Sequence, residues 1–209
     1  MLNHGSRTRG ADSSQTSPKS AEKASAFLSS LKWWPTLIGA GFGAFIAIDL
    51  FNGDEIGGEF ASIVAASGLV YLAAAALHKP SVAWPMFVLS VVVITLSKFG
   101  VFGFDATWLF LTAAIGFVFY ALLRPRGASQ WELPFQAVGM IFFGAAAAVA
   151  LYLDGEAGAY LVAAGLLGHA AWDVYHHRTR RTVARSLAEF CFVLDTTLAL
   201  AILITTMRT

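Results

Sequence analysis

Residues 168–178 gather side chains that can bind protons or metal ions. The segment reads GHAAWDVYHHR, so three histidines and one aspartate fall within nine residues. On a helix that turns about 100° per residue, these side chains share one face and form a polar stripe of His169, Asp173, His176 and His177. Imidazole and carboxylate groups one turn apart can coordinate a divalent metal ion or transfer protons.

Two acids on the following apolar segment can complete this stripe. In a tight helical hairpin, Glu189 reaches a depth similar to that of His169, and Asp195 lies near the middle of its segment. An aspartate at the centre of a membrane-spanning helix costs roughly 2.5–3.5 kcal/mol to insert, so it normally faces the interior of a bundle and marks function. We therefore expect His169, Asp173 and Asp195 to share one cavity open toward the cytoplasm, with Glu189 or His176 at its edge.

Three interpretations of the stripe are open at the level of the sequence. The first is a site for Zn, Fe or Mn, with the candidate ligands His169, Asp173, His176 and Asp195. The second is a proton or substrate relay through His169, Asp173, Glu189 and Asp195. The third is structural, with Asp173 pairing with Arg185 or a histidine to lock two helices together. The sequence assigns no catalytic residue and no organic cofactor.

The strings HAAWDVYHH and, fourteen residues later, CFVLD carry a resemblance. They resemble a family of uncharacterised bacterial multi-span membrane proteins with the pattern H-x-x-W-D-x-x-H-H followed by C-x-x-x-D. The resemblance covers the last two apolar segments, and its residues here are His169, Trp172, Asp173, His176, His177, Cys191 and Asp195. It implies that these residues belong together, and it implies no particular activity.

The elements that must position these residues are membrane-spanning helices. Of the 209 residues, 57% are hydrophobic and only 13% are charged, whereas soluble domains carry about 25% charged residues. A bilayer-spanning helix needs about 20 mostly apolar residues. Seven stretches approach that length, at residues 34–51, 60–77, 82–97, 106–123, 133–152, 157–175 and 183–207. We predict an all-α fold, a polytopic membrane helical bundle of seven transmembrane helices in a single domain over residues 34–209.

Lys and Arg residues are distributed unevenly between the two ends of these helices. Twelve of the fourteen fall in the N-terminal tail or in the loops of one side, and only Lys98 and Arg208 fall on the other. That other side instead carries the acids Asp54, Glu55, Glu59, Asp105, Asp154 and Glu156. Because cytoplasmic loops are enriched in basic residues, we predict that the N-terminus is cytoplasmic, the C-terminus is outside, and the protein lies in the cytoplasmic (inner) membrane.

The first 33 residues differ in composition from the rest. They are polar and rich in Ser, Thr and basic residues at their start, which predicts a disordered cytoplasmic tail. Within residues 21–33, apolar side chains recur at the spacing of a helix that lies in the membrane interface. A loosely ordered leader to the first span is the alternative.

Two long segments resemble each other at a separation of 99 residues. DLFNGDEIGGEFASIVAASGLVYLAAAALHK (49–79) and ALYLDGEAGAYLVAAGLLGHAAWDVYHHR (150–178) each end a span, cross an acidic turn and close on a histidine followed by a base. This similarity predicts a three-plus-one-plus-three parallel repeat, as found in some transporters. The first half has no ionisable group at the corresponding positions, which are Val70, Ala74, Leu77 and Ser90.

Four other residues carry secondary expectations. Gln136 and Ser67 should form hydrogen bonds between helices, and Trp172 should pack or lie at the interface rather than act as a ligand. Asp49, near the outer end of the first span, is either interfacial or the cap of a vestibule.

The composition also limits the classes of function. Basic residues are not interleaved with aromatic ones, so no nucleic-acid partner is expected, and the single cysteine excludes an intramolecular disulfide. The partner is the lipid bilayer, and a homo-oligomer is an open alternative. Transport of a small solute or ion, coupled to protons or to a metal, is the leading hypothesis. The alternatives are an intramembrane metal-dependent enzyme acting on a lipid or lipophilic substrate, and a structural or assembly subunit.

Overall fold

The computed structural model describes residues 33–52, 60–123, 132–153 and 155–208. The chain divides into two units, Met1–Trp34 and Pro35–Thr209, and the fold described below is that of the second. The predicted tail at 1–33 and its interfacial helix at 21–33 therefore lie outside the described residues, apart from Trp33.

The described part of the chain is all-helical, as predicted, and contains no strand. Five of its helices, one of them counted with the turn that precedes it, are long and apolar enough to cross a membrane. The protein is therefore a membrane-embedded, multi-pass helical protein. The α-helices of the described residues are α2 (Trp34–Asn52), α3 (Ala61–Leu77), α4 (Ala83–Lys98), α5 (Ala106–Leu123), α6 (Glu132–Ala150), α7 (Gly155–Thr179) and α8 (Arg185–Thr206), with a 3-10 turn η2 (Pro80–Val82) before α4.

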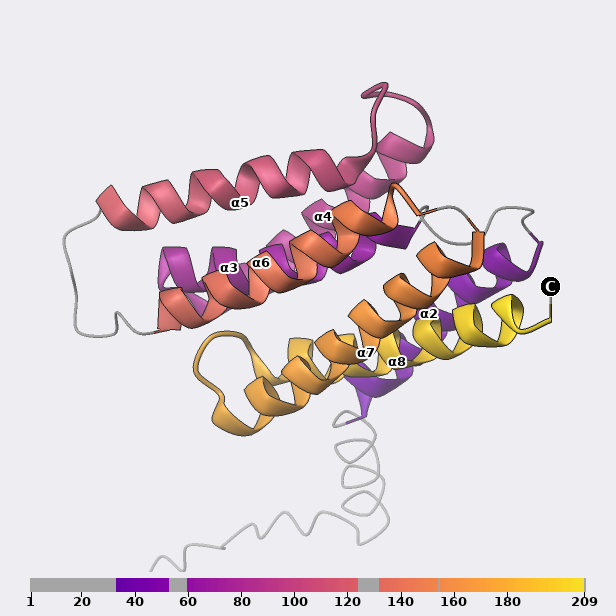
Figure 1. The fold of residues 1–209 in the computed structure, drawn as a ribbon. Helices are drawn as coiled ribbons and strands as arrows, with labels where there is room; N and C mark the ends of the chain where they lie inside the picture. The colour runs from indigo at the N-terminus through magenta and orange to yellow at the C-terminus, as the bar shows by residue number, and fades with distance from the viewer. Residues whose placement is uncertain (1–32, 53–59, 124–131, 154, 209) are drawn as a thin grey trace, which may run out of the picture. The chain divides into compact units, whose positions relative to one another are not determined.

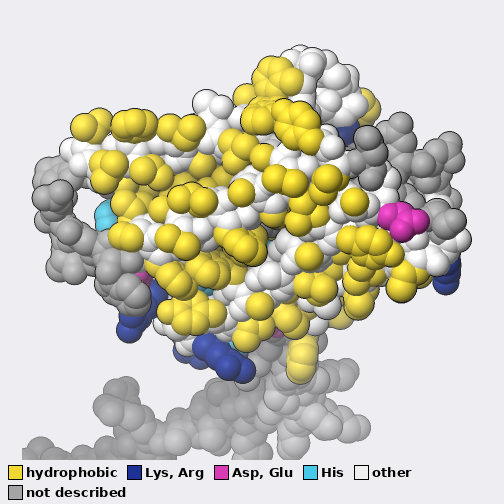
Figure 2. Space-filling model, in the orientation of Figure 1, with side chains coloured by type: hydrophobic (Ala, Val, Ile, Leu, Met, Phe, Trp, Pro, Cys, Tyr) yellow, Lys and Arg dark blue, Asp and Glu magenta, His cyan; other side chains and the backbone are white. Residues whose placement is uncertain are grey.

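Successive helices run in opposite directions, so that their ends form two groups (Figure 1). We call the basic end the one where α3 and α7 finish and α4 and α8 begin; its described cations include Lys79, Arg178, Arg180, Arg181 and Arg185. The opposite, acidic end includes Asp49, Asp105 and Glu156. Between them, apolar side chains cover most of the face seen in Figure 2, as expected of a surface that contacts lipid.

Helix α3 lies at the centre of the bundle and packs against α4, α5, α6 and α7. Fourteen of its seventeen residues are buried, and many of them are alanines. Small side chains allow neighbouring backbones to approach closely, which is the usual way that helices associate in membranes. The helix ends at His78, whose left-handed backbone (φ 52°) lets the Lys79 amide donate to the Ala74 carbonyl.

Helices α7 and α8 form an antiparallel hairpin that packs along its length. Helix α2 packs on the other side of α8 through Gly39 and Gly43, which lie one turn apart. A Cβ atom at Gly39 would lie 2.7 Å from the Phe190 carbonyl oxygen, and one at Gly43 would lie 3.0 Å from the Thr197 Cβ. These glycines therefore bring α2 into backbone contact with the helix that carries Asp195.

Candidate functional site

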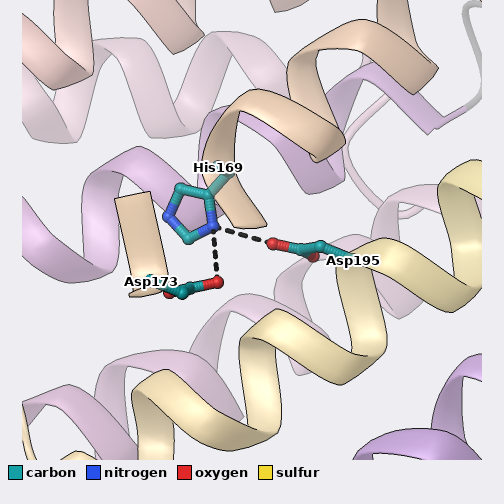
Figure 3. Close-up of side chains that lie close together, drawn as sticks. All are labelled: His169, Asp173 and Asp195. Carbon is teal, nitrogen blue, oxygen red and sulfur yellow. Dashed lines mark hydrogen bonds and ion pairs between the residues drawn. The ribbon is translucent and has the colours of Figure 1, made fainter. Parts of the chain in front are cut away.

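His169, Asp173 and Asp195 form a buried cluster, here called the triad (Figure 3). The His169 Nδ1 atom lies 2.7 Å from Oδ2 of Asp195 and 3.4 Å from Oδ2 of Asp173. His169 and Asp173 come from adjacent turns of α7, and Asp195 comes from the middle of α8. All three are buried. The prediction that they cluster between these two helices is confirmed.

Tyr71 of α3 extends the triad. Its hydroxyl donates a hydrogen bond of 2.5 Å to Oδ1 of Asp173, and its ring lies edge-on to the His169 ring. Tyr71 is itself buried. The sequence interpretation missed this residue, although a tyrosine within an alanine-rich span is a signal, because a buried phenol needs a hydrogen-bond partner.

Two polar atoms of the triad have no hydrogen-bond partner within the described residues, namely Nε2 of His169 and Oδ2 of Asp173. Both are buried, where a polar atom without a partner costs roughly 1–3 kcal/mol. The triad can therefore accept a further proton, a metal ion or a polar group of a ligand. That capacity is the main chemical property of the site.

A cavity of about 370 Å³ reaches the triad. Tyr71, His169 and Asp195 lie in its wall, together with Cys191, which is one turn before Asp195. The remainder is mostly apolar and includes four phenylalanines contributed by α2, by α4 and by the residue before α3; these are Phe42, Phe45, Phe60 and Phe87. The cavity is thus a mainly aromatic and aliphatic chamber with ionisable groups on one wall.

The cavity extends from the triad to the acidic end, where Asp49 and Lys98 line it. Their side chains form an ion pair at 3.6 Å, and the Lys98 ammonium lies 5.2 Å from the centre of the Phe60 ring. A second, open cavity of about 560 Å³ lies beyond and shares Asp49, Ile94 and Lys98 with the first. Asp49 therefore stands at a vestibule, one of its two expected positions.

This direction corrects the expectation of a cavity open toward the cytoplasm, because the cytoplasmic side was assigned to the basic end. At the basic end the described residues enclose a pocket of only about 10 Å³. An aromatic cluster of Phe42, Trp84, Phe87 and Phe190 packs between α2, α4 and α8. The indole N–H of Trp84 also donates to Ser186 at 3.2 Å. These large rings pack against one another between the facing helices.

His176 is not part of the triad, contrary to its expected place as a metal ligand or at the edge of the cavity. Its Nδ1 lies 2.9 Å from the Trp172 carbonyl oxygen, and its Nε2 lies 2.8 Å from the amide nitrogen of Gln136. Because an amide N–H donates and a carbonyl accepts, this pattern places the proton of a neutral His176 on Nδ1. Both of its nitrogens are occupied, so His176 has a structural position.

Gln136 joins α6 to α7, as predicted for a residue that bonds between helices. Its amide nitrogen also donates to Thr182 at 3.3 Å, and its oxygen accepts from the Trp172 indole at 3.2 Å. Trp172 stacks on Phe135 at 4.4 Å between ring centres, which confirms it as a packing residue. Ser67 differs from expectation, because its hydroxyl donates to the Ile63 carbonyl of its own helix.

Glu189 and His177 form a separate polar group near the basic end. Glu189 accepts a 2.6 Å hydrogen bond from Thr36 of α2, and its carboxylate lies 3.9 Å from Nε2 of His177. Arg185 donates from Nε to that same His177 nitrogen at 2.7 Å. Burial, followed by the positive charge of Arg185, lowers the pKa of His177 below its usual value. Glu189 is not part of the triad and is not in the wall of the cavity that reaches it, so its expected position in a relay there is not what the structure shows.

The fold and this site together define a class: a multi-pass, membrane-embedded helical protein with a buried carboxylate–imidazole triad in an apolar cavity. No protein-family model matches the chain, and neither does any curated protein or solved structure.

Proposed function

We propose that the protein is a secondary transporter that moves a small solute across the cytoplasmic membrane in exchange for protons. One observation carries the proposal: the cavity leads from the acidic end of the bundle to a triad in the middle of α7 and α8, whereas a pocket lined by residues near the basic end holds only about 10 Å³. Transporters of the alternating-access type bind their solute near the middle of the membrane and open to one side at a time. The described structure corresponds to one such state.

The charge balance of the triad supports proton coupling. The triad holds two carboxyl groups and one imidazole, and a single imidazolium balances only one carboxylate. The Tyr71 hydroxyl donates to Asp173 but carries no charge, and a second buried carboxylate that no cation balances is strongly unfavourable. The triad therefore holds either an additional proton or a cationic group of a ligand. Because the two compete for one place, binding of one promotes release of the other.

The Asp49–Lys98 ion pair is the element of this proposal that controls entry. It lies where the vestibule meets the inner cavity, and it links the last turn of α2 to the last turn of α4. A cationic solute would compete with Lys98 for the Asp49 carboxylate as it enters. Movement of α2 against α8, over the contact at Gly39 and Gly43, would then close this end and open the other.

The arrangement in the membrane is part of the proposal. With seven spans and a cytoplasmic N-terminus, the acidic end faces outside and the described state is open outward. The similarity of residues 49–79 to residues 150–178 favours a three-plus-one-plus-three parallel repeat, in which the second half supplies His169, Asp173 and Asp195. The resemblance to the H-x-x-W-D-x-x-H-H and C-x-x-x-D family groups these same residues.

The test uses Cys191, the only cysteine of the chain, which lies in the cavity wall. If the protein is a transporter, a membrane-impermeant maleimide should alkylate Cys191 when it is added to either side of the membrane. A change of pH should raise the rate of alkylation from one side and lower the rate from the other. Labelling from the acidic end alone, at every pH, would defeat the proposal. Two matched variants in a Cys191→Ser background, Tyr152→Cys and Arg178→Cys, report which side each reagent reaches and whether the vesicles are intact.

A second candidate function is that of an intramembrane metal-dependent enzyme acting on a lipophilic substrate, and the donor set of the triad favours it. One imidazole nitrogen and one oxygen from each carboxylate lie within 4.8 Å of one another. Ligand atoms that share a metal at about 2.0–2.2 Å lie about 3 Å apart, close to the separations observed here. Protein purified without chelator should then contain one Zn, Fe or Mn ion per chain, and Asp195→Asn should lose it. A metal-free protein that is fully folded would exclude this function.

A further inference from the structure

We infer that the ligand of this cavity is a lipophilic organic cation, with an aromatic or aliphatic body and one positive charge. This inference rests on the proposed function and specifies the chemical class of its solute. It follows from three features of the cavity: the character of its wall, the position of its charges, and its volume.

The wall selects an apolar body. Aromatic and aliphatic side chains together make up most of the cavity wall, and five of them carry the aromatic rings of Phe42, Phe45, Phe60, Tyr71 and Phe87. A strongly hydrated ion such as Na⁺ would lose its water without gaining enough oxygen ligands from such a wall. An organic cation keeps its charge inside an apolar body, and its positive end is attracted to the faces of aromatic rings.

The charged residues of the cavity favour a positively charged ligand. Asp195 lies in the wall, and Asp173 lies behind it on the same imidazole nitrogen. The described wall contains one Lys and no Arg, and that Lys98 is paired with Asp49 at the entrance and stands over the Phe60 ring. An anion would therefore meet carboxylates at the deep end of the cavity. A cation would place its charge beside Asp195.

The volume selects the size. A cavity of about 370 Å³ lies within the range of small-molecule sites, which is roughly 300–1,000 Å³. It is far larger than an alkali-metal ion requires. An apolar cation that filled it would bring its charge beside Asp195 at the triad.

The experiment measures binding of tetraphenylphosphonium to the purified full-length protein in detergent, with tetraphenylborate as the anion of the same shape. The cation should bind at least about tenfold more tightly than the anion, a difference of roughly 1.4 kcal/mol. The bound cation should also protect Cys191 from alkylation.

Asp195→Asn tests the charge at nearly constant volume and should weaken cation binding at least about tenfold. The matched control is Glu156→Gln, an exposed acid on the first turn of α7 that does not line the cavity. It should bind the cation as the unaltered protein does. If Asp195→Asn fails to fold, the comparison of cation with anion and the protection of Cys191 in the unaltered protein still decide the matter.

Equal affinity for the two ions, or unchanged binding by a folded Asp195→Asn protein, would each overturn the inference. These outcomes are distinct from failure of the transport proposal. Cation binding with labelling of Cys191 from one side only would retain the ligand class and reject transport. Labelling from both sides without cation binding would retain transport and reject the ligand class.

Discussion

Tyr71 on α3 and Asp173 on α7 are 102 residues apart in the sequence and are joined by a buried hydrogen bond of 2.5 Å. The tyrosine hydroxyl holds Oδ1 of the carboxylate and leaves Oδ2 to face His169. The central helix thus fixes the orientation of one member of the triad.

Substitution of Tyr71 by Phe should destabilise the folded protein, because Asp173 loses a donor that water cannot replace. We expect a loss of about 1.5–3 kcal/mol in the free energy of unfolding, as for other hydrogen bonds to charged groups. Unfolding by heat or by SDS in mixed micelles measures it. Tyr175→Phe, on the half-exposed side of α7, is the control and should change stability little. Equal stability of both variants would show that the Tyr71 bond contributes nothing.

Replacement of His169 by Gln should be more damaging, since it removes the only imidazole of the triad from between two carboxyl groups. Breaking a buried charge pair by removal of one partner costs about 3–5 kcal/mol. A second change, Asp173→Asn, removes one of the carboxylates that His169 had faced and should restore part of the lost stability. If the double variant unfolds more easily than His169→Gln alone, the triad is not held together by charge. The unfolding midpoints of the single and double variants decide this.

The contact between α2 and α8 should be sensitive to a single methyl group at Gly39. The added Cβ would lie 2.7 Å from the backbone oxygen of Phe190, so the helices must separate. Gly39→Ala should therefore cost about 1–3 kcal/mol, the usual range for overpacking. Gly41→Ala is the matched control, because nothing lies within 4 Å of its added methyl group. The prediction fails if the two variants share one unfolding midpoint.

The His177 group should make stability depend on pH near neutrality. Burial and Arg185 lower the pKa of His177 below 6.5, so the folded protein favours the neutral ring that accepts from Arg185. The unfolded chain binds a proton more readily, so this stability is fully present above about pH 6.5 and is lost as the pH falls through the folded pKa. His177→Gln cannot titrate. As the pH falls from 8 to 5, the unfolding midpoints of the unaltered protein and of His177→Gln should therefore converge or cross. Midpoints that change in parallel with pH would show that His177 is not the group responsible.

The orientation can be tested without any assumption about activity. Reporter fusions after Arg126 and after Arg181 should be cytoplasmic, and fusions after Gly155 should be external. At each position, alkaline phosphatase and green fluorescent protein are fused in turn, because the first is active outside the cytoplasm and the second is fluorescent inside it. A cytoplasmic signal at Gly155 would reverse the arrangement and would turn the described cavity toward the cell interior.

The sequence predicted the helices closely because their ends are set by local chemistry. Helix α5 has the predicted bounds of 106–123, and α3 begins one residue later than the predicted 60–77. Glycines, prolines and charged residues interrupt the apolar runs, and an apolar run of this length has few alternatives to a helix in a membrane. The predicted span at 157–175 is extended to Thr179, since the polar stripe continues the helix beyond its apolar part.

The site could be predicted only in part, because periodicity fixes the face of a helix and not the depth of its partners. His169 and Asp173 are one turn apart on α7, and Nδ1 of His169 contacts the carboxylates of both Asp173 and Asp195. His176 shares their face, but it lies about 10 Å from His169 along the axis and bonds to Gln136 instead. The contribution of Tyr71 and the direction of the cavity depend on packing between α2, α3, α4 and α8. No local pattern in the sequence encodes that packing.

The burial of α3 has a consequence for how the protein fits its membrane. With seventeen residues, this helix is about 26 Å long at 1.5 Å per residue, shorter than a hydrocarbon layer of roughly 30 Å. A helix that contacts lipid at that length would have to thin the bilayer or be strained by it. Because neighbouring helices surround α3, the lengths of those helices, and not the length of α3, have to match the thickness of the membrane. Its short length instead brings Phe60, in the wall of the cavity, closer to Tyr71 and the triad.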